Sequence, residues 1–407
     1  MHGEAALVAT VAAGLGLAFV FGFLAFRLRL PPLVGYLIAG VVVGPFTPGF
    51  VADTDLAPQL AEIGVILLMF GVGLHFSPKD LMAVRGIAIP GALAQIAVAT
   101  ILGALLARFW GWSWSSGVVF GLCLSVASTV VLLRALEDQG ALDTPTGRIA
   151  VGWLIVEDLI AVIVLVLLPA LAPAGSASGG SGLIVAIGWT LAKVVAFLLL
   201  MLVVGRRAVP WLLERVARTG SRELFTLGVL AVALGIAVGA SVLFGVSFAL
   251  GAFFAGMVIA ESDLSSRAAA QALPLQDAFA VLFFVAVGML FDPAILVRQP
   301  VEVLAVVAII LVGKTLAAFL IVAAFGKPLS TALTISASLA QIGEFSFILA
   351  ALGVSLGLLP PAAQGLIVAG ALITITVNPL IFRFAASLER RLEGRTHKQA
   401  SKEAEVQ

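Results

Sequence analysis

Two stretches of this sequence decide the fold: AEIGVILLMFGVGLHFSP at residues 61–78 and QDAFAVLFFVAVGMLFDP at residues 276–293. Each is a run of apolar residues with an acid near its start and a proline at its end. The segment before each stretch also matches its counterpart, at nearly the same offset. Matches in two neighbouring segments favour an internal repeat over chance similarity between apolar helices. The matches are Glu62 with Asp277, Gly73 with Gly288, Phe76 with Phe291 and Pro78 with Pro293 at an offset of 215, and Gly35, Ala39 and Gly40 with Gly251, Ala255 and Gly256 at 216.

The composition identifies an integral membrane protein. Of 407 residues, 61% are hydrophobic and 11% are charged, whereas soluble domains have about 25% charged residues. The mean hydropathy is +1.18. The net charge of +1 leaves no basic face for nucleic acid. One cysteine and three scattered histidines predict no disulfide and no metal cluster. No nucleophile and base occur in a recognisable pattern, so we expect neither an enzyme nor a cofactor.

Apolar runs long enough to span a bilayer, about 20 residues each, occur thirteen times. The first lacks a basic region before it and a cleavage site after it, so we interpret it as a retained helix and not as a signal peptide. The predicted spans are residues 5–26, 31–45, 56–76, 86–107, 116–136, 148–171, 183–204, 223–242, 246–261, 272–291, 301–325, 328–356 and 361–384.

The distribution of basic residues tests this number. The loops after odd-numbered spans, with the C-terminal tail, hold 19 of the 23 Lys and Arg residues, and the other side holds two. The remaining two, Lys193 and Lys314, lie inside spans. Since cytoplasmic loops are enriched in Lys and Arg, we expect a multi-pass protein of the cell (inner) membrane, with its N-terminus outside and its C-terminus in the cytoplasm.

The third span corresponds to the tenth, which is seven spans later. Because successive spans cross the membrane in opposite directions, an odd shift places the two halves in opposite orientations. We therefore predict an all-α polytopic membrane protein with inverted repeats, a common plan of secondary transporters. The predicted transmembrane domain covers residues 1–388, with repeats at about 5–171 and 223–384, a linker helix at 183–204 and an amphipathic surface helix at 209–222. Residues 389–407 are expected to form a cytoplasmic tail, a frayed helix end followed by a disordered stub.

Charged residues near the centre of predicted spans mark the candidate site. Glu157, Asp158, Lys193, Lys314 and Glu344 all lie there. A charge at that depth costs at least about 2.5 kcal/mol and usually has a function. A carboxylate there can hold a proton or a cation in turn, so that exchange follows if only occupied states cross the membrane. The alternative is a structural ion pair that fixes helix packing.

The acid pair is predicted to be asymmetric. Neighbouring residues on a helix point about 100° apart, so Glu157 and Asp158 are expected to face different neighbours. In the repeat alignment Asp158 falls opposite an apolar stretch at 371–373, and Lys314 falls opposite Ala99. One site per chain is therefore expected.

Two spans are predicted to be interrupted. The fifth carries Ser125, Ser128 and Thr129 where its apolar run should be strongest, and the twelfth is long and holds Gln341, Gly343 and Glu344. Hydroxyls and glycine can satisfy an unwound backbone at membrane depth, and freed carbonyls could ligate a cation. Intact helices with Ser and Thr bonded to their own backbone are the alternative.

Four segments carry a resemblance to a known family: VGWLIVEDLIAV, GVILLMFGVGLHFSP, FFVAVGML and ASLAQIGEFSFILAALG. Together they resemble the Kef-type monovalent cation:proton antiporters of the second cation/proton antiporter family, and among these the YbaL-like bacterial members. The resemblance implies a homodimer with crossed discontinuous helices and elevator-like exchange of K⁺ or Na⁺ for H⁺. The family's essential aspartate falls on Asp158, its lysine on Lys314, and its crossing residues on Ser128, Thr129, Gln341 and Glu344.

Two departures from the family pattern bear on the expected function. Kef proteins have Gln where this chain has Glu157, so a second charge could change the stoichiometry. Many Kef-like proteins continue into a nucleotide-binding domain, whereas no G-x-G-x-x-G motif follows a strand pattern here. We expect that regulatory domain to be absent from this chain. The functional alternatives are a pH-gated or ligand-gated cation channel and a membrane pH sensor.

Overall fold

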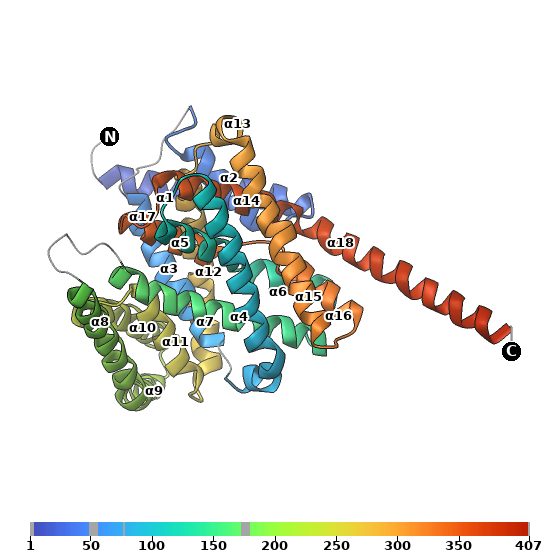
Figure 1. The fold of residues 1–407 in the computed structure, drawn as a ribbon. Helices are drawn as coiled ribbons and strands as arrows, with labels where there is room; N and C mark the ends of the chain where they lie inside the picture. Colours follow the sequence, from blue (N-terminus) through green and yellow to red (C-terminus); the bar gives the residue numbers. More distant parts are fainter. Residues whose placement is uncertain (1–3, 49–55, 76–77, 172–179, 406–407) are drawn as a thin grey trace. The chain divides into compact units, whose positions relative to one another are not determined.

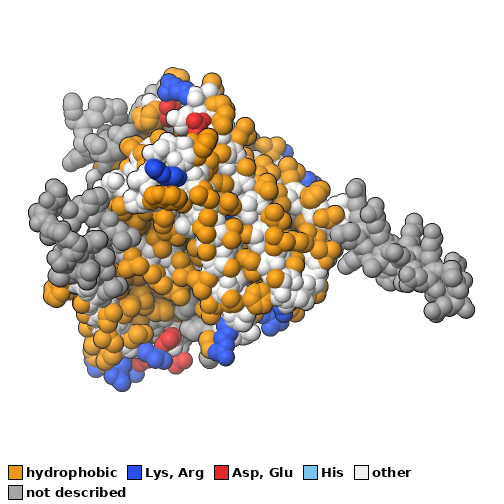
Figure 2. All heavy atoms as spheres, viewed as in Figure 1, with side chains coloured by type: hydrophobic (Ala, Val, Ile, Leu, Met, Phe, Trp, Pro, Cys, Tyr) orange, Lys and Arg blue, Asp and Glu red, His pale blue; other side chains and the backbone are white. Residues whose placement is uncertain are grey.

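The protein is entirely helical over the residues described by the computed structural model, which are 4–48, 56–75, 78–171 and 180–405. Eight of the described helices are long and apolar enough to cross a membrane, and four further apolar helices are shorter. The all-helical membrane fold is confirmed, while the number thirteen stays a prediction. Figure 2 shows hydrophobic side chains over most of the visible face, with charged side chains mostly near its upper and lower margins.

The helices form two compact units, and each unit draws on both halves of the sequence. Unit 1 comprises residues 1–78, 160–294 and 351–365, and unit 2 comprises 79–159, 295–350 and 366–407. The helices within unit 1 are α1 (Glu4–Arg27), α2 (Pro32–Val43), α3 (Leu56–His75), α8 (Gly180–Leu200), the π-helix η1 (Met201–Gly205), α9 (Arg206–Ala217), α10 (Arg222–Phe244), α11 (Phe248–Ala260) and α12 (Ser265–Met289).

Unit 2 holds most of the helices that carry the predicted site. Four helices have residues in both units: α4 (Pro78–Phe109), of which only Pro78 belongs to unit 1, α7 (Pro145–Leu171), α17 (Glu344–Ser355) and α18 (Pro361–Glu405). The helices wholly within unit 2 are α5 (Trp114–Ser125), α6 (Thr129–Asp138), α13 (Ile295–Arg298), α14 (Pro300–Ala308), the π-helix η2 (Ile309–Lys314), α15 (Thr315–Ala324) and α16 (Leu329–Ser338).

Glycines set the close helix packing inside unit 1. Helix α12 packs against α2 and α3, and α3 also packs against α11. A Cβ on Gly40 of α2 would lie 2.8 Å from the Cα of Gly288 on α12, and a Cβ on Gly256 of α11 would lie 3.1 Å from the backbone carbon of Gly73 on α3. Only glycine allows backbones to approach this closely. The apolar core beside these crossings includes Ala18, Ala39, Val43, Val285, Ala286 and Met289.

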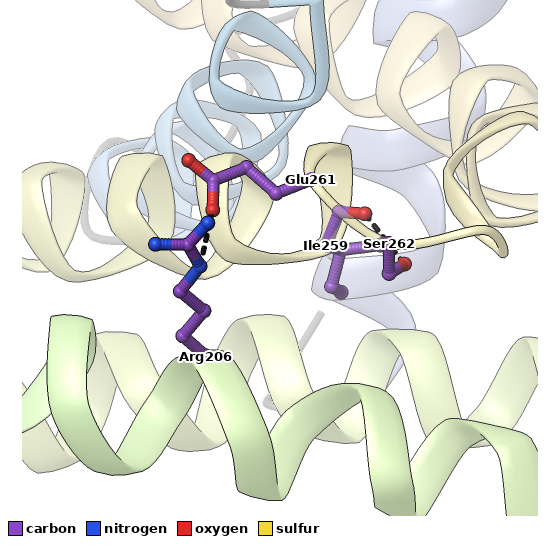
Figure 3. Close-up of polar contacts among 4 residues, drawn as sticks. All are labelled: Arg206, Ile259, Glu261 and Ser262. Atoms are coloured by element: carbon purple, nitrogen blue, oxygen red, sulfur yellow. Dashed lines mark hydrogen bonds and ion pairs between the residues drawn. The ribbon is translucent and has the colours of Figure 1, made fainter.

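A helix, α9, covers much of the segment predicted as a surface helix; it begins three residues earlier than expected, at Arg206, and ends at Ala217. Its location at the membrane surface stays a prediction. The guanidinium of Arg215 lies 4.7 Å from the ring centroid of Trp211 on the exposed side of this helix. Figure 3 shows the ion pair between Arg206 and Glu261, 2.7 Å from Nε to Oε2. In the same view, the Ser262 hydroxyl donates to the carbonyl of Ile259. The ion pair ties α9 to the end of α11.

The C-terminal stretch differs from its expected conformation. Helix α18 continues to Glu405, through the residues that we expected to be a frayed end and a disordered stub. Its last turns contain Ala, Glu, Gln, Lys and Arg, which are strong helix formers. A polar composition therefore did not imply loss of helical structure here.

Candidate cation site

Two interrupted helices form the candidate site, and both breaks lie where the sequence predicted them. Helix α5 ends at Ser125 and α6 begins at Thr129, with Val126 and Ser128 in extended conformation between them. Helix α16 ends at Ser338, and α17 begins at Glu344. Both breaks belong to unit 2, and the helices on either side of them, α5, α6, α16 and α17, are labelled in Figure 1. The backbone groups that the breaks leave outside helical hydrogen bonds need other partners, because a buried unpaired amide is costly.

The amide of Gln341 joins one break to the other. Its Oε1 accepts a hydrogen bond from the backbone N–H of Ser128 at 2.8 Å, and its Nε2 donates to the carbonyl of Ser128 at 3.2 Å. The same Nε2 lies 3.3 Å from the carbonyl of Ser338. One side chain thus satisfies backbone groups in both unwound segments and fixes their crossing.

At position 343 the crossing leaves no room for a side chain, so glycine is required there. A Cβ at this position would lie 2.5 Å from the Cα of Ser128 and would also overlap the Ser128 side chain. Ser128 itself caps α6, because its hydroxyl accepts from the N–H of Val131 at 3.4 Å. The two positions therefore pack as a unit.

The acid pair on α7 divides between two neighbours, as the angle between adjacent residues predicts. Glu157 is fully buried, and its Oε2 accepts from the backbone N–H of Ala127 at 2.7 Å. Asp158 is 5% exposed, and its Oδ2 accepts from the hydroxyl of Thr129 at 3.1 Å. Glu157 therefore supports the unwound backbone, while Asp158 faces the start of α6.

Lys314 interacts with Glu157 through its charge, without an ion pair within 4.0 Å between these two described side chains. Its side chain is fully buried on the π-helix η2, and its ammonium donates to the carbonyl of Gln341 at 3.1 Å. Single π-helical turns often occur at functional sites. Of the described charged groups, those acting on Asp158 are Glu344 and Glu157, both acids.

Glu344 opens α17 and is 1% exposed. Its carboxylate interacts with the hydroxyl of Ser128 and with the backbone N–H of Thr129. An acid is favoured there by the partial positive charge at the start of a helix. Within the described residues, Glu157 Oε1, Asp158 Oδ1 and Glu344 Oε2 are buried without a hydrogen-bond partner.

The described side chains contain no group of three His, Cys, Asp or Glu residues that could hold a metal ion. The site instead offers carboxylate, hydroxyl and carbonyl oxygens, the ligands of hard cations. Of the other predicted residues, Ser125 is buried at the end of α5. Lys193 lies on α8 in unit 1, its ammonium 5.8 Å from the ring centroid of Trp189.

The sequence analysis did not identify three polar residues that bond to the backbone around the breaks. Gln95 on α4 donates to the carbonyl of Ser125 at 3.1 Å and accepts from the indole N–H of Trp153 at 3.5 Å. Asn378 on α18 donates to the carbonyl of Ala337 at 2.9 Å, and Ser346 donates to that of Val126 at 3.4 Å. Each is a single uncharged polar residue inside an apolar run, which is a weaker signal in the sequence than a charge or a cluster of hydroxyls.

Comparison with known proteins identifies the family. The family profile described as "Sodium/hydrogen exchanger, transmembrane" matches residues 15–387. The chain belongs to this family. Its members are membrane transporters and not enzymes, and the antiporter family predicted from the sequence motifs is confirmed.

Individual relatives agree with this membership. The chain is 64% identical over 394 residues to the putative cation/proton antiporter YbaL of Escherichia coli, covering 96% of this chain and 70% of that protein. It is 34% identical over 355 residues to the K(+) efflux antiporter 4 of Arabidopsis thaliana, covering 87% of this chain and 59% of that one. It is also similar, at 33% identity over 337 residues, to the glutathione-regulated potassium-efflux protein KefC of Klebsiella pneumoniae, covering 82% of this chain and 53% of that protein.

A solved structure shares the fold. The sodium proton antiporter MjNhaP1 of Methanocaldococcus jannaschii superimposes with a TM-score of 0.69 at 17% sequence identity, over 93% of this chain and 97% of that one. At this identity the likeness supports the fold alone.

Proposed function

We propose that this chain is a secondary transporter that exchanges a monovalent cation for H⁺ by alternating access. Asp158 binds the cation and the proton in competition. The observation that carries this proposal is the environment of Asp158: it is buried beside two helix breaks, it keeps one unpartnered carboxylate oxygen, and its described charged neighbours are acids.

This environment favours an exchange mechanism for a physical reason. A buried carboxylate without a basic partner is costly to leave ionised and empty. Asp158 can avoid that cost by taking up a proton or a dehydrated cation, but one excludes the other. Because the empty ionised site is the expensive state, movement of the site across the membrane is favoured only when it is occupied. Coupled exchange follows from these two conditions.

K⁺ is the favoured cation, and Na⁺ is the second candidate. The support for K⁺ comes from relatives named as K(+) efflux and potassium-efflux proteins. The geometry offers oxygen ligands that suit either ion. The cytoplasmic C-terminus, the homodimer and the one exchange site per chain belong to this proposal as well.

The glycine crossings of unit 1 support the inverted repeat on which alternating access would act. In the repeat alignment Gly40 corresponds to Gly256, and Gly73 to Gly288. Replacing each glycine in the contact of Gly40 with Gly288 by its counterpart gives the contact of Gly256 with Gly73, and both contacts are present. Gly64 lies against Phe279, which is its own counterpart at the offset of 215. Equivalent residues meet in this way near a two-fold axis.

Exchange by purified protein in proteoliposomes tests the proposal. An imposed pH gradient should be dissipated on addition of K⁺ or Na⁺ by the wild type, and Asp158→Asn should abolish this exchange, since an amide binds neither the proton nor the cation as a carboxylate does. Asp143→Asn, the same substitution at an exposed turn, should leave exchange intact. If none of Li⁺, Na⁺, K⁺ and Rb⁺ dissipates the gradient, the antiporter proposal is wrong. Uncoupled conductive flux would instead indicate a channel, and an absence of any flux would leave a sensor.

A further inference from the structure

We infer that Glu344 is a second, direct carboxylate ligand of the transported cation and shares the ion with Asp158. This inference rests on the proposed exchange function and extends it, because it assigns the cation to two helices, α7 and α17, that are far apart in the chain.

Thr129 brings the two acids together. Its hydroxyl donates to Asp158 Oδ2 at 3.1 Å, while its backbone N–H interacts with the Glu344 carboxylate. The charges of Asp158 and Glu344 also act on one another. The two carboxylates therefore flank the first residue of α6, one supplied by the continuous helix α7 and the other by the second interrupted helix.

Each of these acids keeps one oxygen for a ligand. Asp158 is 5% exposed and Glu344 is 1% exposed, yet Oδ1 of the first and Oε2 of the second have no hydrogen-bond partner among the described residues. If Glu344 served only to cap the start of α6, this second oxygen would be expected to have its own donor, because buried polar atoms are rarely left unpaired. Glu157 Oε1 is also unpartnered, but the charge of Lys314 acts on Glu157. The oxygens of Asp158 and Glu344 lie beside Thr129, and the described charges that act on Asp158 are acids, which indicates a cation between these two carboxylates.

The charge balance of unit 2 leads to the same conclusion. The described charged groups that act on one another at this site are Glu157, Asp158, Glu344 and Lys314. Lys314 balances Glu157, so Asp158 and Glu344 have no balancing side chain. Two like charges in a medium of low dielectric constant repel strongly. A cation bound to only one of them would leave that repulsion, whereas a cation shared by both would offset it.

The test compares cation affinity in the wild type and Glu344→Gln, which keeps the shape of the side chain and removes its charge. Two readouts are measured: the K⁺ or Na⁺ concentration for half-maximal exchange in proteoliposomes, and the rise in Tm of the purified protein when choline is replaced by the same cation. Affinity for hard cations depends on the number of charged ligands. We expect a loss of affinity of about tenfold or more in both readouts. Glu62→Gln, at an exposed acid of α3 in unit 1, is the matched control and should match the wild type.

The outcomes separate this inference from the proposed function. If the wild type exchanges cations and Glu344→Gln keeps the wild-type affinity, Glu344 is not a ligand and the inference is overturned. If the wild type exchanges nothing, the proposed function fails first. Should Glu344→Gln not fold, Glu344→Asp replaces it: its carboxylate is withdrawn by one methylene, so the order of preference among Li⁺, Na⁺, K⁺ and Rb⁺ should change. An unchanged order and affinity would contradict the inference.

Discussion

At the scale of single residues, Glu157 and Asp158 have different tasks although they are neighbours on one helix. Glu157 accepts from the backbone of Ala127 and interacts with Lys314, so its charge is used to hold the break in α5 and α6. Asp158 has a threonine hydroxyl and acids around it. The difference supports a structural role for the first acid and the proposed ion-binding role for the second.

The pairing of Glu157 with Lys314 predicts how substitutions there combine. Lys314→Met should lower the stability of the protein by about 3 kcal/mol, because it leaves the buried Glu157 charge without its partner. The double variant Glu157→Gln with Lys314→Met should recover part of this loss, since both charges are then gone. Thermal unfolding of the purified variants in detergent measures the cycle. Strictly additive effects of the two substitutions would show that the charges do not interact.

At the scale of helices, the two breaks are held by side chains that come from neighbouring helices. Gln95, Glu157, Lys314 and Asn378 each supply a hydrogen bond to backbone that the breaks leave unpaired. An interrupted helix inside a membrane is tolerated only with such partners. The geometry of the site is therefore a property of several helices of unit 2 together.

The crossing itself predicts the effect of one methyl group. Gly343→Ala should destabilise the protein by about 1–3 kcal/mol or more, because the new Cβ would overlap Ser128 and force the backbone apart. Gly235→Ala on α10 is the matched control, since a Cβ there meets nothing within 4 Å. It should be neutral or slightly stabilising, as alanine is the better helix former. The measurement is the Tm of each purified variant, compared with that of the wild type. Equal Tm values for the two variants would show that the crossing is not as tight as described.

At the scale of the whole molecule, the sequence was most informative at polar groups that are costly to bury in a membrane. A charge or a hydroxyl cluster in an apolar span must have partners, so Asp158, Lys314 and both breaks could be predicted. Gln95 and Asn378 could not, because one amide in an apolar run does not reveal which backbone carbonyl it will meet. The two compact units were also hidden from the sequence, since each combines segments of both halves and only packing decides which segments join.

The internal repeat predicts that matched substitutions in the two halves have matched effects. Gly40→Ala would place a Cβ against the backbone of α12, and Gly256→Ala would place one against the backbone of α3. If these contacts are images of one another, each should destabilise the protein by a similar amount, about 1–3 kcal/mol. Gly16→Ala on α1, where a Cβ meets nothing within 4 Å, should cost little and controls for the change of residue type. The measurement is the Tm of the three purified variants at one detergent and salt concentration. If one half tolerated the methyl group and the other did not, the two crossings would differ in function, and the symmetry on which the alternating-access proposal rests would be limited to sequence.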